Sequence, residues 1–335
     1  MKNYKISIIM PIYNAEKFLK KSITSIMNQS IGFENIELLL VDDKSTDSSK
    51  KIMESYSNKY SNIKTFYSSI NYGYPGHGRN IGLMNSNAPY IMFIDNDDEY
   101  DEKYCEKMLN TMYAEDCDVA CANYKMKFKE KTNEISCFSK IEDYTYTSHN
   151  NKLVDLNRLS KLNDSEVWTK IFKKSIITEN NIKFVEKNLA EDTLFLFEYY
   201  AHAKKLIYLD YTGYTWHRDH ESLSTSSKTP INYIKSYYNV LNFLKNHHEN
   251  LDYNYFCQKC VEVSIIRTIY SDDKKSILKE LYNFEKTIKF SGELTDKWLT
   301  FINNFILKQK FTFATFILNL LFWFKRILDY LRKIK

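Results

Sequence analysis

Acidic and amide side chains follow three apolar runs in the first hundred residues. The runs 5–10, 36–41 and 90–94 are followed by Pro11-Ile12-Tyr13-Asn14, by Asp42-Asp43 and by Asp95-Asn96-Asp97-Asp98. If the runs are parallel strands, these groups gather at the carboxyl edge of one sheet, where α/β proteins bind ligands. So many carboxylates in one place need a cation. Mg²⁺ or Mn²⁺ with a diphosphate is the natural occupant, because both ions take hard oxygen ligands.

The pair Asp95 and Asp97 is the centre of this predicted site. Side chains of an extended strand repeat every second residue, so both carboxylates project to the same side. Taken alone, the pair is a weak indication, since acidic turns after strands are common. The apolar run that precedes it and the second pair, Asp42 and Asp43, favour a functional interpretation.

The elements that must position these groups alternate along the first half of the chain. Strands are predicted at 5–10, 36–41, 63–67 and 90–94, with helices between them, the first beginning at Asn14 as its N-cap. Such repeated strand–helix–strand units predict an α/β fold with a mostly parallel, Rossmann-like central sheet and helices on both faces. Beyond residue 115 we expect strands at 118–126 and 208–216 and helices at 175–180 and 192–203.

The C-terminal third has a different composition, almost free of Gly and Pro, which predicts helices. We therefore divide the chain into a catalytic domain, 1–228, a helical region, 229–307, and a basic amphipathic helix, 308–335. The sequence leaves three roles open for 229–307: packing on the catalytic domain, binding the acceptor, or forming a homo-oligomer contact.

Residues 308–335 contain seven basic residues and one acidic residue, so they account for +6 of the net charge of +5 and leave −1 for the remainder. A nearly neutral body argues against nucleic-acid binding. The apolar stretch 311–324 is shorter than the roughly 20 residues that span a bilayer. With its basic flanks it predicts a helix lying on a membrane surface, the alternative being a helix packed on the body.

Six cysteines without framework spacing, and the lack of a signal peptide before the first strand, indicate a reducing compartment. Together with the basic helix, this predicts a cytoplasmic protein held peripherally at the inner face of the cell membrane.

Six segments in order resemble the inverting family-2 glycosyltransferases of the GT-A fold. They are residues 7–14, 37–47, 79–82, 93–98, 189–195 and 214–224. The resemblance covers residues 5 to about 225, and it implies transfer of a sugar from a nucleotide donor, a UDP-sugar by default, to an acceptor hydroxyl. The segments specify neither donor nor acceptor. The Gln-x-x-Arg-Trp sequence of processive members does not follow Asp192, which implies a non-processive hexosyl- or N-acetylhexosaminyltransferase.

The resemblance also implies roles for nucleotide-binding residues. Pro11, Tyr13 and Asp43 match positions that hold the uridine, with Asp43 accepting from the uracil ring. Arg79 matches a position near the uracil and the phosphates, and Asp95 matches an acid that holds the ribose or reaches the metal through water. Arg79 has the alternative of pairing with a surface acid.

Two further positions carry the expected chemistry. Asp97 matches the direct ligand of Mn²⁺ or Mg²⁺, and Asp192 matches the base that takes the proton of the acceptor. His217 is expected as a second metal ligand or a diphosphate contact. For Glu191 and Asp192 the alternative is a pair of acids that complement a helix N-terminus.

Three residues are candidates for contacts with the donor sugar or the acceptor: Trp168, Glu191 and Arg218. Trp168 is equally well interpreted as a half-buried core residue. The leading hypothesis is an enzyme of cell-surface polysaccharide or glycolipid synthesis, using a glycan or lipid-linked acceptor. The alternatives are a non-catalytic scaffold with the same fold and, less favoured, a nucleotidyltransferase, whose Gly-rich loop is missing after the first strand.

Overall fold

The computed structural model describes residues 3–128, 131–135, 166–187, 190–218, 234–242, 254–289, 294 and 296–334. The chain divides into two compact units, Met1–His220 and Glu221–Lys335. The boundaries expected at 228 and 307 stay predictions, and residue 228 lies outside the described residues.

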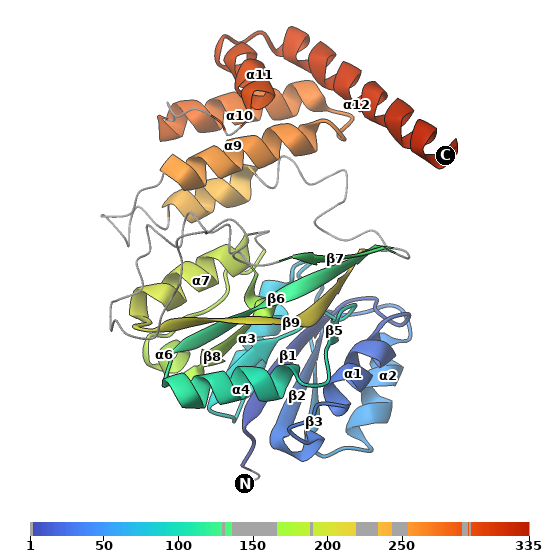
Figure 1. Cartoon of the computed structure of the whole chain (residues 1–335), viewed down its shortest axis with the longest axis vertical. Coiled ribbons are helices and arrows are strands. Elements are labelled where there is room, and N and C mark those ends of the chain that lie inside the picture. The colour runs from blue at the N-terminus through green and yellow to red at the C-terminus, as the bar shows by residue number, and fades with distance from the viewer. Residues whose placement is uncertain are drawn as a thin grey trace. The chain divides into compact units, whose positions relative to one another are not determined.

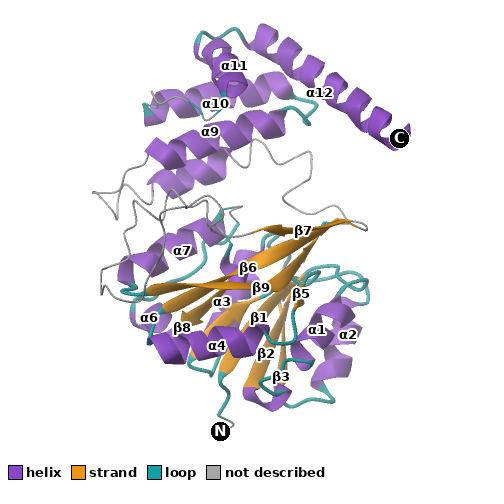
Figure 2. Ribbon diagram, in the orientation of Figure 1, coloured by secondary structure: helices purple, strands orange, loops and turns teal. Residues whose placement is uncertain are grey.

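The first unit is built on one sheet, which has nine strands within the described residues (Figures 1 and 2). They are β1 (Ile6–Ile12), β2 (Ile36–Asp42), β3 (Ile63–Tyr67), β4 (Tyr90–Phe93), β5 (Glu99–Tyr100), β6 (Val119–Phe128), β7 (Lys131–Ile135), β8 (Lys170–Lys173) and β9 (Leu206–His217). The order is β3-β2-β1-β4-β8-β6-β9-β5, and β7 pairs with β6. Neighbours among β3, β2, β1 and β4 are parallel, whereas β8 runs antiparallel to β4 and β6. The predicted mostly parallel sheet is confirmed.

Helices cover both faces of this sheet, as predicted. On one side lie α1 (Leu19–Met27), α2 (Ser49–Ser57) and α4 (Tyr104–Glu115), which share a core with Ile8 and Met10 of β1. On the other lie α3 (Pro75–Asn85), α6 (Lys174–Glu179) and α7 (Glu191–His202), which share a core with Ile9. Alternate residues of a buried strand point to opposite faces, so an uninterrupted apolar run supplies both cores.

The predicted N-cap role of Asn14 is wrong. Helix α1 begins at Leu19, and Asn14 has a φ of 48°, in the left-handed region that short polar side chains tolerate. Its Oδ1 accepts a hydrogen bond from the backbone N–H of Thr46 at 2.8 Å, and its own N–H donates to Ser45 Oγ at 2.9 Å. Asn14 therefore ties the loop after β1 to the loop after β2.

Helix α3 approaches strand β1 closely because two of its residues have no side chain. A Cβ on Gly82 would lie 2.3 Å from Cγ2 of Ile9, so any larger residue at this position would clash with β1. A Cβ on Gly78, directly before Arg79, would lie 3.1 Å from Cβ of Pro11. This close approach brings the side chain of Arg79 to the end of the sheet.

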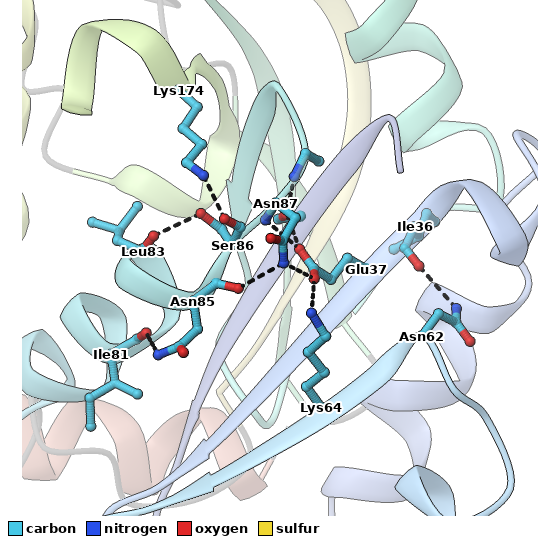
Figure 3. A network of polar contacts seen from close by, with 12 residues as sticks. Ile36, Glu37, Asn62, Lys64, Ile81, Leu83, Asn85, Ser86, Asn87 and Lys174 are labelled. Atoms are coloured by element: carbon cyan, nitrogen blue, oxygen red, sulfur yellow. Dashed lines mark hydrogen bonds and ion pairs between the residues drawn. The ribbon is translucent and has the colours of Figure 1, made fainter. Parts of the chain in front are cut away.

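Near the amino ends of β1, β2 and β3, Glu37 is fully buried, and both oxygens of its carboxylate accept hydrogen bonds (Figure 3). Its carboxylate accepts from Lys64 Nζ at 2.5 Å, from Ser7 Oγ at 2.6 Å, and from both the backbone N–H and Nδ2 of Asn87 at 2.7 Å. Burial alone would raise the pKa of Glu37, but these hydrogen bonds, that of Lys64 foremost, hold it below its usual value. The network fastens β1, β2, β3 and the segment before β4.

The second unit is helical, with α9 (Asn254–Thr268), α10 (Lys274–Ile288), α11 (Lys297–Leu307) and α12 (Phe311–Ile334). The predicted helical C-terminal region is confirmed. Glu285 of α10 is buried, and its Oε1 accepts from Asn303 Nδ2 of α11 at 2.7 Å. Among the residues the structure describes, no helix has both the length and the apolar character needed to cross a bilayer.

Candidate active site

The carboxyl ends of three adjacent parallel strands bring the predicted polar groups to one edge. Ile12 at the end of β1 pairs in register with Asp42 at the end of β2, and Ile9 pairs with Phe93 at the end of β4. The side-chain amide of Asn96 donates to the backbone oxygen of Pro11 at 2.9 Å. The segment that begins at Asp95 therefore lies against the end of β1, as the sequence predicted.

Asp43 and Tyr13 lie at this edge in different environments, Asp43 buried and Tyr13 exposed. The carboxylate of Asp43 is buried and accepts from the backbone N–H groups of Tyr72 at 3.0 Å and Gly73 at 2.9 Å. Gly73 has a φ of 78°, so the turn that presents these N–H groups favours glycine. Tyr13 is 47% exposed, which leaves its ring open to a planar ligand. The uridine contacts of both residues stay predictions.

Arg79 is the electrostatic centre of the site. Its guanidinium is almost fully buried, and it donates to Asp95 Oδ1 at 3.0 Å, to Glu191 Oε1 at 3.1 Å, and to Oδ1 of Asp192. Burial would lower the pKa of Arg79, but the three carboxylates, with Asp192 the strongest influence, raise it. Arg79 thus pairs with acids, but its guanidinium is buried and not at the surface as the alternative from the sequence had it, and its contact with a nucleotide stays a prediction.

The two acids at the start of α7 have raised pKa values. Burial brings the pKa of Glu191 to about 8, and the neighbouring charge of Asp192 adds to this. Burial brings the pKa of Asp192 to about 6, although the Arg79 guanidinium opposes the shift. A carboxylate with a pKa near 6 is ionised at neutral pH and still takes up a proton readily, which suits a general base.

The three acids of the loop after β4, Asp95, Asp97 and Asp98, lie in different environments. The carboxyl of Asp98 is buried and accepts from Tyr214 Oη at 2.6 Å and from the backbone N–H of His217 at 2.8 Å. Asp98 is therefore a structural anchor for the loop. Asp95 and Asp97 remain partly exposed, and burial, together with the charge of Asp97, raises the pKa of Asp95.

A divalent cation fits this donor set. Carboxylate oxygens are the ligands that Mg²⁺ and Mn²⁺ prefer, and one or two of them usually suffice when a diphosphate supplies the remaining oxygens. Asp97 and Asp95 are the partly exposed acids of this loop, whereas Asp98 is buried and anchored to β9. No cluster of three or more His, Cys, Asp or Glu side chains suited to a metal occurs among the described residues.

His217, the other predicted metal ligand, makes contacts within the protein. Its Nε2 lies 2.5 Å from Oε1 of Glu99, and the same carboxylate oxygen lies 2.6 Å from Lys21 Nζ. The side chain of His217 is 10% exposed. Metal ligation by His217 stays a prediction and would require its ring to leave Glu99.

Trp168 and Arg218 each contact an aromatic residue of β9. Trp168, which is 8% exposed, stacks on Tyr214 with ring centroids 4.3 Å apart. The guanidinium of Arg218 lies 4.8 Å from the ring centroid of Trp216. Trp168 is a buried core residue here, and the sugar or acceptor contacts expected of Trp168, Glu191 and Arg218 stay predictions.

Two side-chain contacts near the candidate site were not predicted from the sequence. Tyr214 holds Asp98, yet nothing in the order of residues links a tyrosine to an acid 116 positions earlier. Glu186 lies 2.8 Å from Nδ1 of His77, whose ring stacks on Tyr72 with centroids 3.5 Å apart. Strand alternation could have indicated that Tyr214 and Trp216 share a face of β9, but not which loop they meet.

Comparisons with known proteins agree with this geometry. Residues 7–177 match the family described as Glycosyl transferase family 2. The chain is 31% identical over 253 residues to a poly(ribitol-phosphate) beta-glucosyltransferase of Bacillus spizizenii, covering 72% of this chain and 37% of that protein. It is also 31% identical over 236 residues to the poly(ribitol-phosphate) beta-N-acetylglucosaminyltransferase TarP of Staphylococcus aureus, covering 69% of each. The chain spans less than half the length of several other relatives, between 12% and 46%.

Among solved structures, the crystal structure of S. aureus TarS 1-349 in complex with UDP-GlcNAc superposes with a TM-score of 0.66 at 23% identity, covering 85% of this chain and 81% of that one. This likeness shows that the fold is that of the GT-A enzymes. The family match covers half of the chain and includes strand β1, Asp43, Arg79 and the Asp95–Asp98 loop. With its motifs gathered at one edge of a GT-A sheet, the chain is a glycosyltransferase that belongs to glycosyl transferase family 2.

Proposed function

We propose that this chain transfers a hexosyl or N-acetylhexosaminyl group from a UDP-sugar to an acceptor hydroxyl, with inversion and without processive elongation. The observation that carries the proposal is the placement of Arg79, whose buried guanidinium hydrogen-bonds both Asp95 and Asp192. The acid expected at the donor and the acid expected at the acceptor therefore belong to one site, although they are far apart in the sequence.

In this reaction Asp192 takes the proton of the acceptor hydroxyl while the acceptor oxygen forms a bond to the anomeric carbon. The bond between that carbon and the diphosphate oxygen breaks, and UDP leaves with the electron pair. A single displacement on the face opposite the leaving group inverts the anomeric configuration. A bound Mn²⁺ or Mg²⁺ at Asp97 would neutralise the negative charge that grows on the diphosphate.

UDP-glucose and UDP-GlcNAc are the donors we favour. The names of the relatives specify glucose or N-acetylglucosamine transfer, and the superposed TarS structure contains UDP-GlcNAc. In this chain we assign the uridine to Pro11, Tyr13 and Asp43, which follow neighbouring strands of the sheet, with Tyr13 exposed and Asp43 buried.

The acceptor we propose is a hydroxyl of a polyol-phosphate polymer or a related lipid-linked cell-surface glycan. Three of the relatives are named for poly(ribitol-phosphate). An anionic acceptor is also compatible with the charge at the ends of β6 and β9, where Lys127 stands in register with His217 and Arg218 follows directly. We place the enzyme at the cytoplasmic face of the membrane, with the basic C-terminal helix on the lipid surface, and homo-oligomer formation stays a prediction.

The test is a donor screen on the complete chain with Mn²⁺ or Mg²⁺, following UDP release from UDP-glucose, UDP-GlcNAc and UDP-galactose, first without acceptor and then with poly(ribitol-phosphate). We expect one donor to be hydrolysed slowly alone and used at least tenfold faster with the polymer. Asp97→Ala and Asp192→Asn should each reduce transfer at least a hundredfold, whereas Glu102→Gln, an exposed acid of the same unit, should not.

The two site variants also separate binding from catalysis. Calorimetry should show that Asp97→Ala loses metal-dependent UDP binding, while Asp192→Asn keeps it, because the base contacts the acceptor. If both variants transferred sugar at the wild-type rate, the proposal would be wrong. If the wild-type chain bound no nucleotide in the presence of metal, a non-catalytic scaffold would be the better description.

A further inference from the structure

Helices α11 and α12 expose an unusual number of large apolar side chains. Trp298 and Phe301 of α11 and Phe313, Phe316, Leu320 and Trp323 of α12 are between 39% and 60% exposed. We refer to these six residues as the aromatic face. An exposed apolar surface that extends over two helices marks a site of interaction.

The aromatic face is not the normal inner face of either helix. Leu299, Ile302 and Ile306 of α11 are buried, as are Ala314 and Leu318 of α12, so each helix already has a second apolar face that packs within the unit. Residues 313, 316, 320 and 323 follow one another at helical spacing and lie along one side of α12. Both helices are therefore apolar on the side that packs and again on a side that meets solvent.

Ring contacts join the two helices into one surface. The ring centroids of Phe301 and Phe305 lie 5.0 Å apart, those of Phe305 and Phe313 lie 4.6 Å apart, and those of Phe313 and Phe316 lie 6.5 Å apart. This row of rings runs from α11 across the turn into α12. The surface is thus built by a packed pair of helices and extends N-terminal to the amphipathic segment 308–335.

The charge around the aromatic face favours one kind of partner. The sequence from 297 to 328 contains no acidic residue, and Lys308 and Lys310 in the turn between the helices are both exposed. Tryptophan rings beside basic residues are typical of protein surfaces that enter the headgroup region of a bilayer. Lysine also attracts anionic lipid headgroups.

We propose that the aromatic face binds the surface of an anionic lipid bilayer, with α11 and α12 inserting their exposed rings together and Lys308 and Lys310 contacting the headgroups. The proposal extends the membrane association proposed above and rests on that proposed function. It assigns residues of α11, which the sequence did not single out, to the membrane contact.

The test is sedimentation of the complete chain with vesicles of phosphatidylcholine alone or mixed with phosphatidylglycerol. We expect binding to the mixed vesicles that weakens with salt, and at least tenfold weaker binding to neutral vesicles. Phe316→Gln on α12 and Phe301→Gln on α11 should each reduce binding several-fold. The control variants Asn304→Gln and Asn319→Gln, at exposed positions of the same helices, should not.

Three outcomes would overturn the proposal: no vesicle binding by the wild-type chain, loss in Phe316→Gln without loss in Phe301→Gln, or self-association through the face. Light scattering on a sizing column distinguishes the last case, because the aromatic variants would then change the molecular mass. Asp97→Ala should bind vesicles like wild type, and the aromatic variants should hydrolyse donor normally. Failure of membrane binding is therefore distinguishable from failure of the proposed sugar transfer.

Discussion

Nη2 of Arg79 and Oδ1 of Asp95 lie 3.0 Å apart, which joins helix α3 to the end of strand β4. Because the same guanidinium also reaches Glu191 and Asp192, one buried cation faces three carboxylates. The site has an excess of negative charge before any ligand arrives, and a divalent cation would reduce it. We infer that Arg79 positions the acids on both the donor side and the acceptor side of the proposed site.

Replacing Arg79 by Met should destabilise the catalytic unit and nearly abolish transfer. Removing one partner from a buried ion pair typically costs about 3–5 kcal/mol, and here Glu191 is itself buried. Denaturant unfolding measures the loss, which should shrink at lower pH as the carboxyls take up protons. Lys51→Met, at an exposed position of α2, is the matched control. An unchanged free energy of unfolding in Arg79→Met would contradict the role assigned to this cation.

The rate of transfer should fall in acid because Asp192 must be ionised to act as a base. Its pKa of about 6 predicts that kcat/KM is constant above that pH and falls about tenfold per unit below it. The Arg79 guanidinium lowers this pKa, so Arg79→Gln should move the acid limb to higher pH in whatever activity remains. A limb near pH 4 in the wild type would show that burial does not control this carboxyl.

Loss of the hydroxyl of Tyr214 should loosen the loop 95–98, the proposed metal site, without leaving a cavity in the core. Tyr214→Phe keeps the ring stacked on Trp168 but leaves Oδ2 of Asp98 without its donor at 2.6 Å. A buried polar group left without its hydrogen-bond partner costs about 1–3 kcal/mol. We expect a loss of that order in thermal unfolding and a several-fold higher concentration of Mn²⁺ for half-maximal rate. Tyr113→Phe, whose side chain is largely exposed, should change neither quantity.

Glu37 should stabilise the fold at neutral pH and lose this effect in acid. Its folded pKa is lowered, so its contribution is fully present above the unfolded value of about 4.3 and is lost as the pH falls through the folded value. Glu37→Gln should therefore cost about 1–3 kcal/mol at pH 7 and much less at pH 3. Urea unfolding at both pH values, beside the exposed control Glu34→Gln, measures the difference.

Glu285 should have the opposite pH dependence. Burial raises its pKa to about 7, and its Oε2 has no hydrogen-bond partner among the described residues. Among the described residues, Asn303 of α11 donates a hydrogen bond to Glu285, and the thiol of Cys260 of α9 interacts with it electrostatically. Stability from the protonated form is complete below about pH 4.3 and is lost as the pH rises through 7.

Glu285→Gln should remove this pH dependence, leaving the variant about 2–3 kcal/mol more stable than wild type above pH 7. Unfolding of the helical unit followed by circular dichroism from pH 4 to 8 measures it. The control is Glu280→Gln on the same helix. Equal pH profiles for Glu285→Gln and wild type would contradict the buried, protonated carboxyl.

Much of the catalytic unit could be predicted because its strands are continuous apolar runs. The predicted segments 36–41 and 63–67 differ from β2 and β3 by at most one residue. The polar edge followed from the parallel arrangement, and Asp95 and Asp43 lie there as expected. The left-handed conformation of Asn14 could not be predicted, because its partner Thr46 is a loop residue 32 positions away. Likewise, the charge pattern did not show that Arg79 would face Asp95, 16 positions later, together with Glu191 and Asp192, more than a hundred positions later.

The link between Asp98 and strand β9 has a consequence for synthesis of the protein. Asp98 emerges from the ribosome early, but its two hydrogen-bond donors, Tyr214 and His217, follow 116 and 119 residues later. Domains fold from the N-terminus as the chain grows, so the first four strands can pair while the acidic loop still lacks its anchor. The nascent enzyme therefore cannot hold this loop in its final form until β9 is made. Release of a chain that ends before β9 would give most of the sheet, but the proposed metal site would lack its anchor.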